Sequence, residues 1–548
     1  MKLSLRTARP GRPMALLLVA LAVIGQTHRA SGGDTVLNAA MESITTGDLK
    51  RHAVLLSNDT FEGREAGSRG GRAASVYLAK ELQRLGLAGG AADGSYFQPF
   101  NGNSRNILAK LEGSDPLLQE QVVVVSAHYD HVGYGNQQNS FGPIGHIHNG
   151  ADDNASGTAG LVEVIEACKK LPEAPRRTIL FAFWDAEEAG LLGSKHWLEH
   201  PSIPLSHIVA MLNADMIGRL RGERVEILGS RTAPGFRQLV SFQNEQLNLL
   251  LDFTWTMKED SDHYSFFAKN IPVLMLHTGL HNDYHRPSDD AEKLDIPGLE
   301  RVSRLMFLTT CSLANAERLP KFRAASRHET PESQILQERP LGPLPGRMGV
   351  QWDPQPSQEP GIRVTGVTPK SAASIAGIQV GDRLLRVGNR DLHDGEVFRR
   401  VVLAARGPLD FAVQRRGQDE PLTVRVRPTG APVRVGVTWR LDDAEPGAAT
   451  LTRVVPGSPA DDAGLLVNDR VYEVGGKAFH TSDQFHRLLL DQPRPMPVLV
   501  ERAGRLLTIQ VPAPLDLEPT DAEEEETPAT ARQQPRLILP GPVGSNSR

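Results

Sequence analysis

The sequence predicts an α/β fold with a mostly parallel central sheet sandwiched by helices, followed by two small β-rich domains. Two observations indicate it. Four continuous apolar runs alternate with segments of helical periodicity up to Leu319, and a gapless internal repeat lies beyond residue 347. Continuous apolar runs are typical of strands that a parallel sheet buries on both faces. Their alternation with helices indicates that helices cover both faces of that sheet.

The first thirty residues predict a signal peptide. Four basic residues among the first twelve positions precede the apolar run 14–24. This run is shorter than the roughly 20 residues that span a bilayer, and the order of a basic and then an apolar segment is the form of a secretory signal. We therefore expect a secreted or periplasmic protein that is not integral to a membrane after cleavage of residues 1–30. The alternative is an uncleaved membrane anchor.

The first globular domain is expected over residues 31–319. Its expected elements are strands at 121–126, 178–184, 208–212 and 272–276, and helices at 73–85 and 156–168. In sheets of this kind, ligands bind at the carboxyl ends of the strands. Functional residues are therefore expected directly after these apolar runs.

The rest of the chain divides into a linker, two copies of one small domain and a tail. The sequence predicts a linker at 320–347, domains at 348–428 and 432–513, and an acidic disordered tail at 514–548. Gly349 recurs as Gly436, and the positions that follow stay in step without a gap, which indicates a repeat of one domain. A proline-rich linker normally permits relative motion, so a chain that ends near Leu319 is expected to fold alone.

Charge balance and cysteine content exclude several classes of function. The 60 Lys and Arg residues against 65 Asp and Glu residues give a formal net charge of −5, whereas nucleic-acid binding usually needs a strongly basic face. Two cysteines, Cys168 and Cys311, are too few for a disulfide scaffold or a thiolate zinc finger, and whether they pair stays open. A metal ion would have to be held by His, Asp and Glu.

Histidine and carboxylate residues follow the ends of the expected strands. In chain order they are His128, Asp130, Asp152, Asp153, Glu187, Glu188, Asp215 and His285. Clustered without compensation, such carboxylates would repel one another and would carry a desolvation cost. Two zinc ions would supply the compensation, because two histidines and three carboxylates suit a pair of ions with one bridging carboxylate. For each segment alone, an ordinary turn or helix N-cap is the alternative.

Five motifs carry a resemblance to a known family. SAHYDHVG, GADDNASG, FWDAEEAG, LNADMIG and YHRPSDD resemble, in this order, the motifs of secreted bacterial di-zinc aminopeptidases of peptidase family M28. The segments FEGREAGSRG, SRNI and SDHYSF extend the resemblance, which covers residues 48–319. It implies two zinc ions per chain. One would be held by His128, Asp153 and Asp215, and the other by Asp153, Glu188 and His285.

The same resemblance assigns further roles. It implies that Glu187 is the catalytic base, that Asp130 is the partner of His128, and that Tyr284 polarises the oxyanion. It also implies a cis peptide bond after the bridging Asp153, while Asp152 does not match a ligand position. The expected activity is that of an exported zinc-dependent aminopeptidase. Such an enzyme hydrolyses the N-terminal bond of peptides with a free N-terminus, using a metal-activated water and a Glu base.

The repeated domains resemble PDZ domains of the bacterial protease-associated type, in VTPKSAASIAGIQVGDRL and its second copy. Such domains bind extended chain ends by adding a strand to a sheet edge, so peptide or protein C-termini are expected partners. The alternative is a pair of packing modules without a ligand. Two alternatives to the whole function also stay open. They are a glutaminyl cyclase of the same fold, which the complete ligand set disfavours, and a non-catalytic PDZ scaffold, which the presence of Glu187 disfavours.

Overall fold

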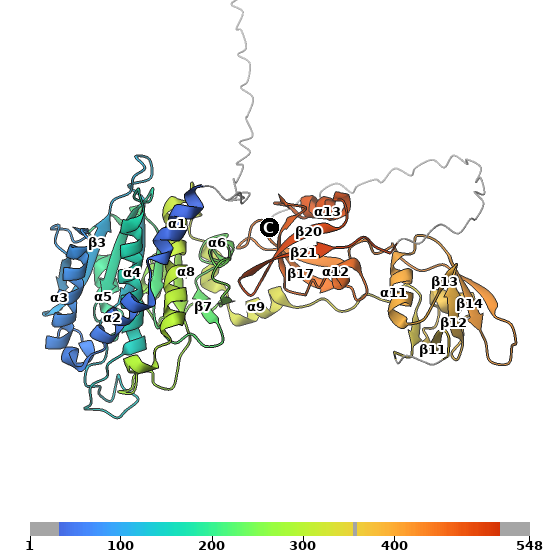
Figure 1. Cartoon of the computed structure of the whole chain (residues 1–548), viewed down its shortest axis with the longest axis horizontal. Coiled ribbons are helices and arrows are strands. Elements are labelled where there is room, and N and C mark those ends of the chain that lie inside the picture. The colour runs from blue at the N-terminus through green and yellow to red at the C-terminus, as the bar shows by residue number, and fades with distance from the viewer. Residues whose placement is uncertain (1–31, 355–358, 516–548) are drawn as a thin grey trace, which may run out of the picture. The chain divides into compact units, whose positions relative to one another are not determined.

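The computed structural model describes residues 32–354 and 359–515 (Figure 1). The chain divides into two compact units, one of residues up to 344 together with 434–513, and the other of residues 345–433 together with those from 514 onwards. The expected signal peptide and the expected tail beyond Leu515 lie outside the described residues. Within the two described ranges, no helix combines the length and the apolar character that a membrane span needs.

A nine-stranded sheet forms the centre of the first domain, in the order β1-β3-β5-β4-β6-β9-β7-β8, with β2 paired to β3. Its strands are β1 (Ala88–Gly89), β2 (Phe97–Phe100), β3 (Ser104–Leu111), β4 (Val122–His128), β5 (Thr178–Trp184), β6 (Ile208–Ala214), β7 (Arg224–Leu228), β8 (Leu250–Phe253) and β9 (Val273–His277). All four expected apolar runs overlap strands, namely β4, β5, β6 and β9.

The sheet is mixed, whereas the sequence predicts a mostly parallel one. The four central strands β5, β4, β6 and β9 pair in parallel. At one side β3 pairs antiparallel with β1, β2 and β5, and at the other β7 pairs antiparallel with β9. Short connections such as the one between β2 and β3 allow only antiparallel pairing, because a parallel pair needs a longer crossover.

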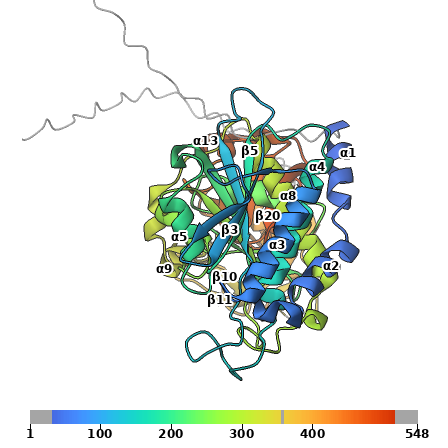
Figure 2. The same cartoon turned by 90° about the vertical axis from the view of Figure 1, so that its left-hand side faces the viewer.

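Helices cover both faces of this sheet, with α3, α4 and α8 on one side and α5 on the other (Figure 2). The helices are α1 (Gly32–Glu42), α2 (Thr46–Leu56), α3 (Arg69–Arg84), α4 (Gly157–Lys170), α5 (Leu192–Glu199), α6 (Phe236–Gln243), α7 (His263–Ala268) and α8 (Ile296–Asn315). The two expected helices overlap α3 and α4.

Alternating side chains of the central strands build a separate core on each face. In β5, Phe181 and Phe183 belong to the larger apolar cluster, which includes residues of α4 and α8. Leu180 and Trp184 belong to a second cluster together with Trp197 of α5. Because both faces of β5 are buried, its sequence is an uninterrupted apolar run.

The two cysteines, whose pairing the sequence leaves open, are both free and buried. Cys168 lies in α4 and Cys311 lies in α8. The hydrogen bond to Cys168 and burial both raise the pKa of the Cys311 thiol well above its ordinary value. Such thiols are chemically inert, since the thiolate is the reactive form.

Two six-stranded antiparallel sheets with the same strand order make up the expected β-rich domains, one in each unit. The first comprises β10 (Val350–Trp352), β11 (Ile362–Val367), β12 (Arg383–Val387), β13 (Arg390–Asp391), β14 (Leu409–Gln414) and β15 (Leu422–Val426), with helices α10 (Ala372–Ala376) and α11 (Gly395–Ala404). The second comprises β16 (Val437–Leu441), β17 (Ala449–Val454), β18 (Arg470–Val474), β19 (Lys477–Ala478), β20 (Met496–Arg502) and β21 (Arg505–Val511), with helices α12 (Pro459–Asp462) and α13 (Ser482–Asp491).

The segment expected as a linker, 320–347, holds a helix, α9 (Pro331–Glu338). Arg327 donates hydrogen bonds to the carbonyl oxygens of Phe267 (3.1 Å) and Ala268 (2.9 Å). Glu338 forms an ion pair with the buried Arg470 of β18 at 2.7 Å. Within the first unit this segment contacts both the nine-stranded domain and the second antiparallel domain. This differs from the free relative motion that its composition predicts.

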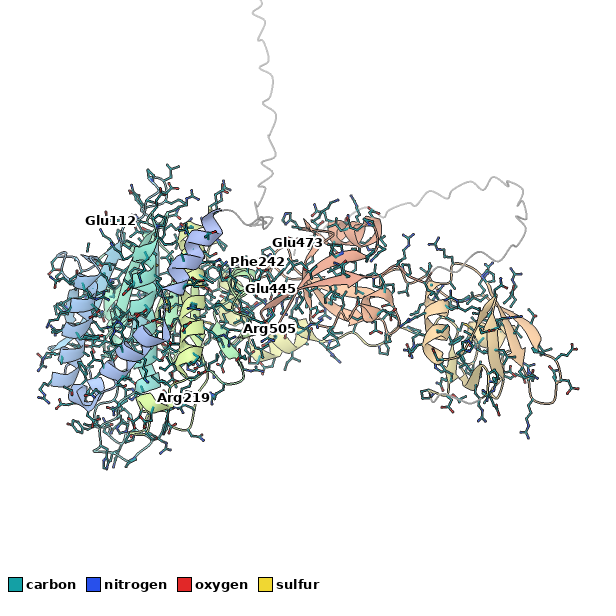
Figure 3. The ribbon with its side chains drawn as sticks, in the orientation of Figure 1. Glu112, Arg219, Phe242, Glu445, Glu473 and Arg505 are labelled. Atoms are coloured by element: carbon teal, nitrogen blue, oxygen red, sulfur yellow. The ribbon has the colours of Figure 1, made fainter. Side chains whose placement is uncertain are left out.

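The edge strand β8 is covered within the same unit by the hairpin of β20 and β21. The Leu251 amide donates a hydrogen bond to the Ala503 carbonyl oxygen at 2.9 Å. Arg505, labelled in Figure 3, donates to the carbonyl oxygen of Asn248 at 2.8 Å. Covering an edge strand in this way shields unpaired backbone groups that would otherwise promote association with other chains.

Candidate metal centre

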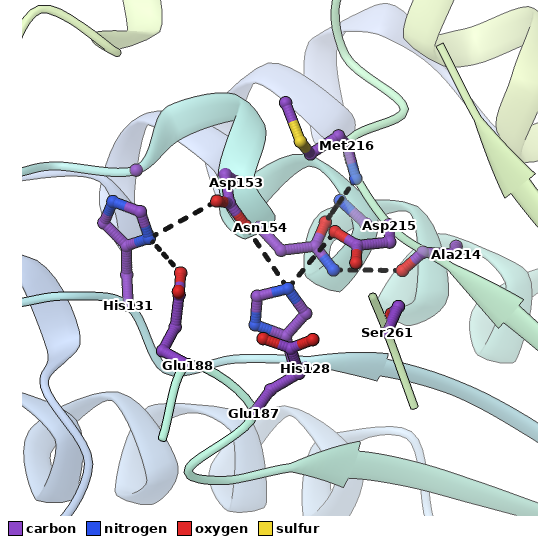
Figure 4. Close-up of polar contacts among 12 residues, drawn as sticks. His128, His131, Asp153, Asn154, Glu187, Glu188, Ala214, Asp215, Met216 and Ser261 are labelled. Atoms are coloured by element: carbon purple, nitrogen blue, oxygen red, sulfur yellow. Dashed lines mark hydrogen bonds and ion pairs between the residues drawn. The ribbon is translucent and has the colours of Figure 1, made fainter. Parts of the chain in front are cut away.

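The candidate site lies at the carboxyl ends of the parallel strands β4, β5 and β6. His128 is the last residue of β4, Glu187 and Glu188 lie in the loop after β5, and Asp215 directly follows β6. Figure 4 shows these side chains gathered in one place. Because the strands run parallel, their carboxyl ends meet at one edge of the sheet, as expected from the sequence.

Asp153 reaches the site from a wide turn, residues Ala151–Ser156, which precedes α4. The peptide bond between Asp153 and Asn154 is cis, as the resemblance implies. The Asn154 side chain donates a hydrogen bond to the Ala214 carbonyl oxygen (3.0 Å) and accepts one from the Met216 amide (3.1 Å). These bonds connect the turn to the end of β6 (Figure 4).

Asp289 also holds this turn, and its role was not predicted from the sequence. Its Oδ2 accepts hydrogen bonds from the backbone amides of Asp152 (2.9 Å) and Asp153 (3.1 Å). Asp152 accepts a hydrogen bond from the Gly218 amide through Oδ1 (2.7 Å), and its Oδ2 lies 3.1 Å from His281 Nε2. Asp152 therefore supports the turn and belongs to neither ligand group.

Two groups of side chains share Asp153. In the first group, His128 Nε2 lies 3.3 Å from Asp153 Oδ1 and 3.2 Å from Asp215 Oδ1. In the second group, His285 Nε2 lies 3.2 Å from Asp153 Oδ2 and 2.9 Å from Glu188 Oε2. The two oxygens of Asp153 thus face different histidines, which is the arrangement that a carboxylate bridging two metal ions requires. The structure brings together all five expected ligands, and their roles stay predictions.

His131 joins the second group, and it was not predicted from the sequence. Its Nδ1 lies 2.7 Å from Glu188 Oε1 and 3.8 Å from Asp153 Oδ2, and the ring is fully buried. Figure 4 shows it beside Glu188. The only signal in the sequence is its place three residues after His128, within the same motif.

Asp130 lies next to His128, as the resemblance implies. The His128 Nδ1 is closer to the Asp130 backbone carbonyl oxygen (3.2 Å) than to its carboxylate Oδ1 (3.7 Å). A partner on this nitrogen fixes the tautomer and the orientation of a ring whose Nε2 binds a metal.

Arg64 organises the loops beneath the site and was also missed. Its buried guanidinium donates hydrogen bonds to carbonyl oxygens of Leu56, Tyr129, Asn149 and Gly150. Burial lowers the pKa of Arg64 to about 10, against the attraction of nearby carboxylates. One side chain thereby connects the loop after β4 with the loop that leads to Asp153.

The charges of the cluster suit divalent cations. Burial raises the pKa of the Glu187 carboxyl well above its ordinary value, and the charges of Glu188 and Asp215 raise it further. Burial lowers the pKa of His285, but its contacts with Asp153 and Glu188 outweigh burial and raise the pKa to about 10. Both shifts reflect an excess of negative charge in a buried place, which bound divalent cations would neutralise.

Tyr284 stacks on the ring of His285, with centroids 3.9 Å apart and planes 29° from parallel. Burial raises the pKa of its hydroxyl far above the ordinary value, and the carboxylates of Asp153 and Glu188 add to the shift. The phenol therefore stays protonated at neutral pH and is available as a hydrogen-bond donor at the rim of the cluster.

Comparison with known families gives three matches. Residues 106–310 match the family model described as Peptidase family M28. Residues 338–408 and 450–502 each match a model described as PDZ domain.

This chain is similar to curated proteins over about half of its length. Leucine aminopeptidase 1 of Grosmannia clavigera is 30% identical over 310 residues, covering 52% of this chain and 72% of that protein. Leupeptin-inactivating enzyme 1 of Streptomyces exfoliatus is 28% identical over 277 residues, covering 50% of this chain. The match spans only 58% of the length of the Streptomyces enzyme. Among solved structures, the Legionella pneumophila LapA aminopeptidase matches with a TM-score of 0.43 at 19% identity, over 54% of this chain and 79% of that one.

Proposed function

The chain belongs to peptidase family M28, and we propose that it is a zinc-dependent aminopeptidase that removes the N-terminal residue from peptides with a free N-terminus. The observation that carries the proposal is the position of Asp153 between two groups of metal-binding side chains. The leucine aminopeptidase among the similar proteins supports the choice of substrate class.

The residues present fit a pair of zinc ions. Histidine nitrogen and carboxylate oxygen are donors that zinc accepts, and three protein ligands for each ion leave a position for water or substrate. The first ion would be held by His128, Asp153 and Asp215, and the second by Asp153, Glu188 and His285. Zinc ions bound there would supply Lewis acidity and would lower the pKa of water toward neutrality.

Glu187 is the proposed proton carrier. A carboxylate acts as a general base when its pKa is raised toward the working pH, and burial shifts the pKa of Glu187 in that direction. In this role Glu187 takes a proton from the attacking water and delivers it to the amine that leaves. Tyr284 donates a hydrogen bond to the oxyanion that forms on the scissile carbonyl.

Two further parts of the proposal concern regions outside the site. Residues 1–30 direct the chain to export, in keeping with their basic and then apolar composition. The two PDZ domains bind extended peptide or protein C-termini by strand addition. The first statement rests on the sequence alone, and the second rests on the sequence and on the two PDZ family matches.

Chelation and a comparison of substrates test the proposed activity. The full-length protein should hydrolyse leucyl anilide, should lose this activity on dialysis against a chelator, and should regain it with zinc. Acetylation of the substrate's amine should abolish hydrolysis, because an aminopeptidase needs the free N-terminus. Full activity in the metal-free protein, or cyclisation of glutaminyl peptides without hydrolysis of leucyl anilide, would contradict the proposal.

A further inference from the structure

His131 is the strongest unexplained feature next to the metal centre. It lies in the loop after β4, and its amide donates a hydrogen bond to the Arg64 carbonyl oxygen at 3.2 Å. Its ring packs against Gly150 so closely that a Cβ there would lie 2.5 Å from ring carbons. Gly150 also has a positive φ of 55°, a conformation that side chains disfavour. The chain thus leaves room for this ring and fixes its position.

The two oxygens of Glu188 have separate partners. Oε1 lies 2.7 Å from His131 Nδ1, whereas Oε2 lies 2.9 Å from His285 Nε2. The His285 nitrogen also lies 3.2 Å from Asp153 Oδ2, which places Oε2 in the second ligand group. With Oε1 held by His131, the carboxylate has a defined rotation and presents only Oε2 to that group.

His131 also lies close enough to Asp153 and Glu188 for the three to hold a metal ion, but two features favour a hydrogen-bonding role for His131 over direct ligation. Its Nδ1 is 3.8 Å from Asp153 Oδ2, which is farther than the corresponding distance for His285. Its Nε2 is buried and has no hydrogen-bond partner among the described residues. A histidine that binds a metal almost always donates a hydrogen bond from its other ring nitrogen, and His131 has no acceptor for one within the described part of the chain. With its proton on Nδ1 and donated to Glu188, the ring leaves only the Nε2 lone pair without a partner among the described residues.

We propose that His131 is a positioning residue, which holds Glu188 through Oε1 so that Oε2 faces the second metal ion together with His285 and Asp153. The proposal rests on the proposed function, since it assumes that metal binds there. It extends that function by naming a residue outside the five expected ligands on which the second metal position depends.

Zinc titration of full-length variants tests the proposal without any substrate. Each metal-free protein is titrated with zinc in competition with a chromophoric chelator, which yields the affinity for the first and the second ion. His131→Leu removes the donor and keeps most of the volume, so the second ion should bind about 10- to 100-fold more weakly while the first is unchanged. His131→Asn keeps a donor near the place of Nδ1 and should restore most of the affinity.

A matched control comes from His52, which is also buried and faces a buried carboxylate, with its Nε2 3.4 Å from Glu163 Oε1. His52→Leu should leave both zinc affinities unchanged. If His131→Leu does not fold, His131→Gln is titrated in its place. The longer Gln side chain puts its amide near the place of Nε2 rather than Nδ1, so it should not restore the affinity for the second ion as Asn does.

Three outcomes overturn the proposal. If His131→Leu binds the second ion as tightly as wild type, His131 does not position Glu188. The same holds for His131→Gln where the Leu variant does not fold. Equal weakening in the Asn and Leu variants indicates that His131 itself is the ligand, since an amide cannot replace an imidazole on zinc. If the wild-type protein does not bind a second ion, the second metal site does not exist and the proposal is wrong. Hydrolysis of leucyl anilide by the wild-type protein, measured separately, shows whether the proposed function fails as well.

Discussion

Asp130 Oδ1 accepts a hydrogen bond from the backbone amide of Glu187 at 3.0 Å. Its Oδ2 lies 3.4 Å from the amide of Glu188 and accepts a second, longer bond. The loop after β4 is thereby attached to the two glutamates that follow β5. One buried carboxylate lies beside the His128 ring and also fixes the backbone from which the proposed base and a proposed ligand extend.

The two neighbouring glutamates should respond differently to the same substitution. Glu187→Gln should keep both zinc ions and lose about 10²–10⁴-fold in kcat, because the nearly isosteric amide cannot take a proton from water. Glu188→Gln should lose metal, since it removes the charge that faces His285 and His131. Metal analysis and steady-state kinetics on both variants check this. Equal loss of metal in the two would show that the roles are wrongly divided.

The bridging position of Asp153 predicts an unequal effect of ligand substitutions. Asp153→Ala should bind neither ion tightly, because one oxygen faces His128 and the other faces His285. His128→Ala and His285→Ala should each weaken mainly one ion. Metal content after gel filtration distinguishes these cases. If Asp153→Ala still holds one ion as tightly as wild type, the carboxylate does not bridge.

Asp289 should matter although it belongs to neither ligand group. Removing its carboxylate in Asp289→Ala leaves the buried amides of Asp152 and Asp153 without an acceptor, at a cost of about 1–3 kcal/mol for each group. We expect a lower free energy of unfolding in urea for the metal-free protein, together with weaker zinc binding. The neighbouring Asp290 is a matched control, since it is partly exposed and accepts a side-chain hydrogen bond from Asn149. Asp290→Ala should lower the free energy of unfolding clearly less than Asp289→Ala does. An equal decrease in the two variants would contradict the role of Asp289 in holding the turn.

The centre of the fold and the place of the site can be predicted from the sequence for one physical reason. A strand buried on both faces is apolar along nearly its whole length, so an apolar run such as 178–184 can be recognised as a strand from the sequence. Parallel strands also end at the same edge, so the sequence pattern alone places Asp215 and His128 near each other.

The supporting residues could not be predicted in the same way. Arg64 and Asp289 act on backbone atoms, and a backbone carbonyl or amide has no sequence signature. Their partners lie far along the chain, as with Arg64 and Gly150, which are 86 positions apart. The role of His131 depends on which oxygen of Glu188 it faces, and only coordinates decide that. The antiparallel flanks were missed because their strands are short and not continuously apolar.

The contact between the first domain and the second PDZ domain should contribute strongly to stability. Arg237 and Glu501 form an ion pair at 2.8 Å, with side chains 8% and 0% exposed. Breaking a buried pair by removing one partner costs about 3–5 kcal/mol, so Glu501→Ala should lower the free energy of unfolding by that order. Arg224 and Asp252 form an exposed pair in the same region, with side chains 60% and 50% exposed. Asp252→Ala should change stability by no more than about 1 kcal/mol. Thermal unfolding of both variants compares them directly.

A chain that ends near Leu319 should keep the active site but lose stability. All five proposed ligands lie between His128 and His285, and the PDZ domains contribute none of them. The truncation nevertheless removes Glu329 and Asp442, which pair with the buried Arg231 at 2.7 and 2.8 Å.

The same truncation removes the partner of Arg237 and exposes the edge of β8. We therefore expect a lower unfolding temperature and association that increases with concentration, measured by calorimetry and light scattering, since exposed edge strands promote pairing between chains. Monomeric truncated protein should still bind zinc and cleave leucyl anilide. A truncated chain as stable as the full-length protein would show that these contacts contribute little to the fold.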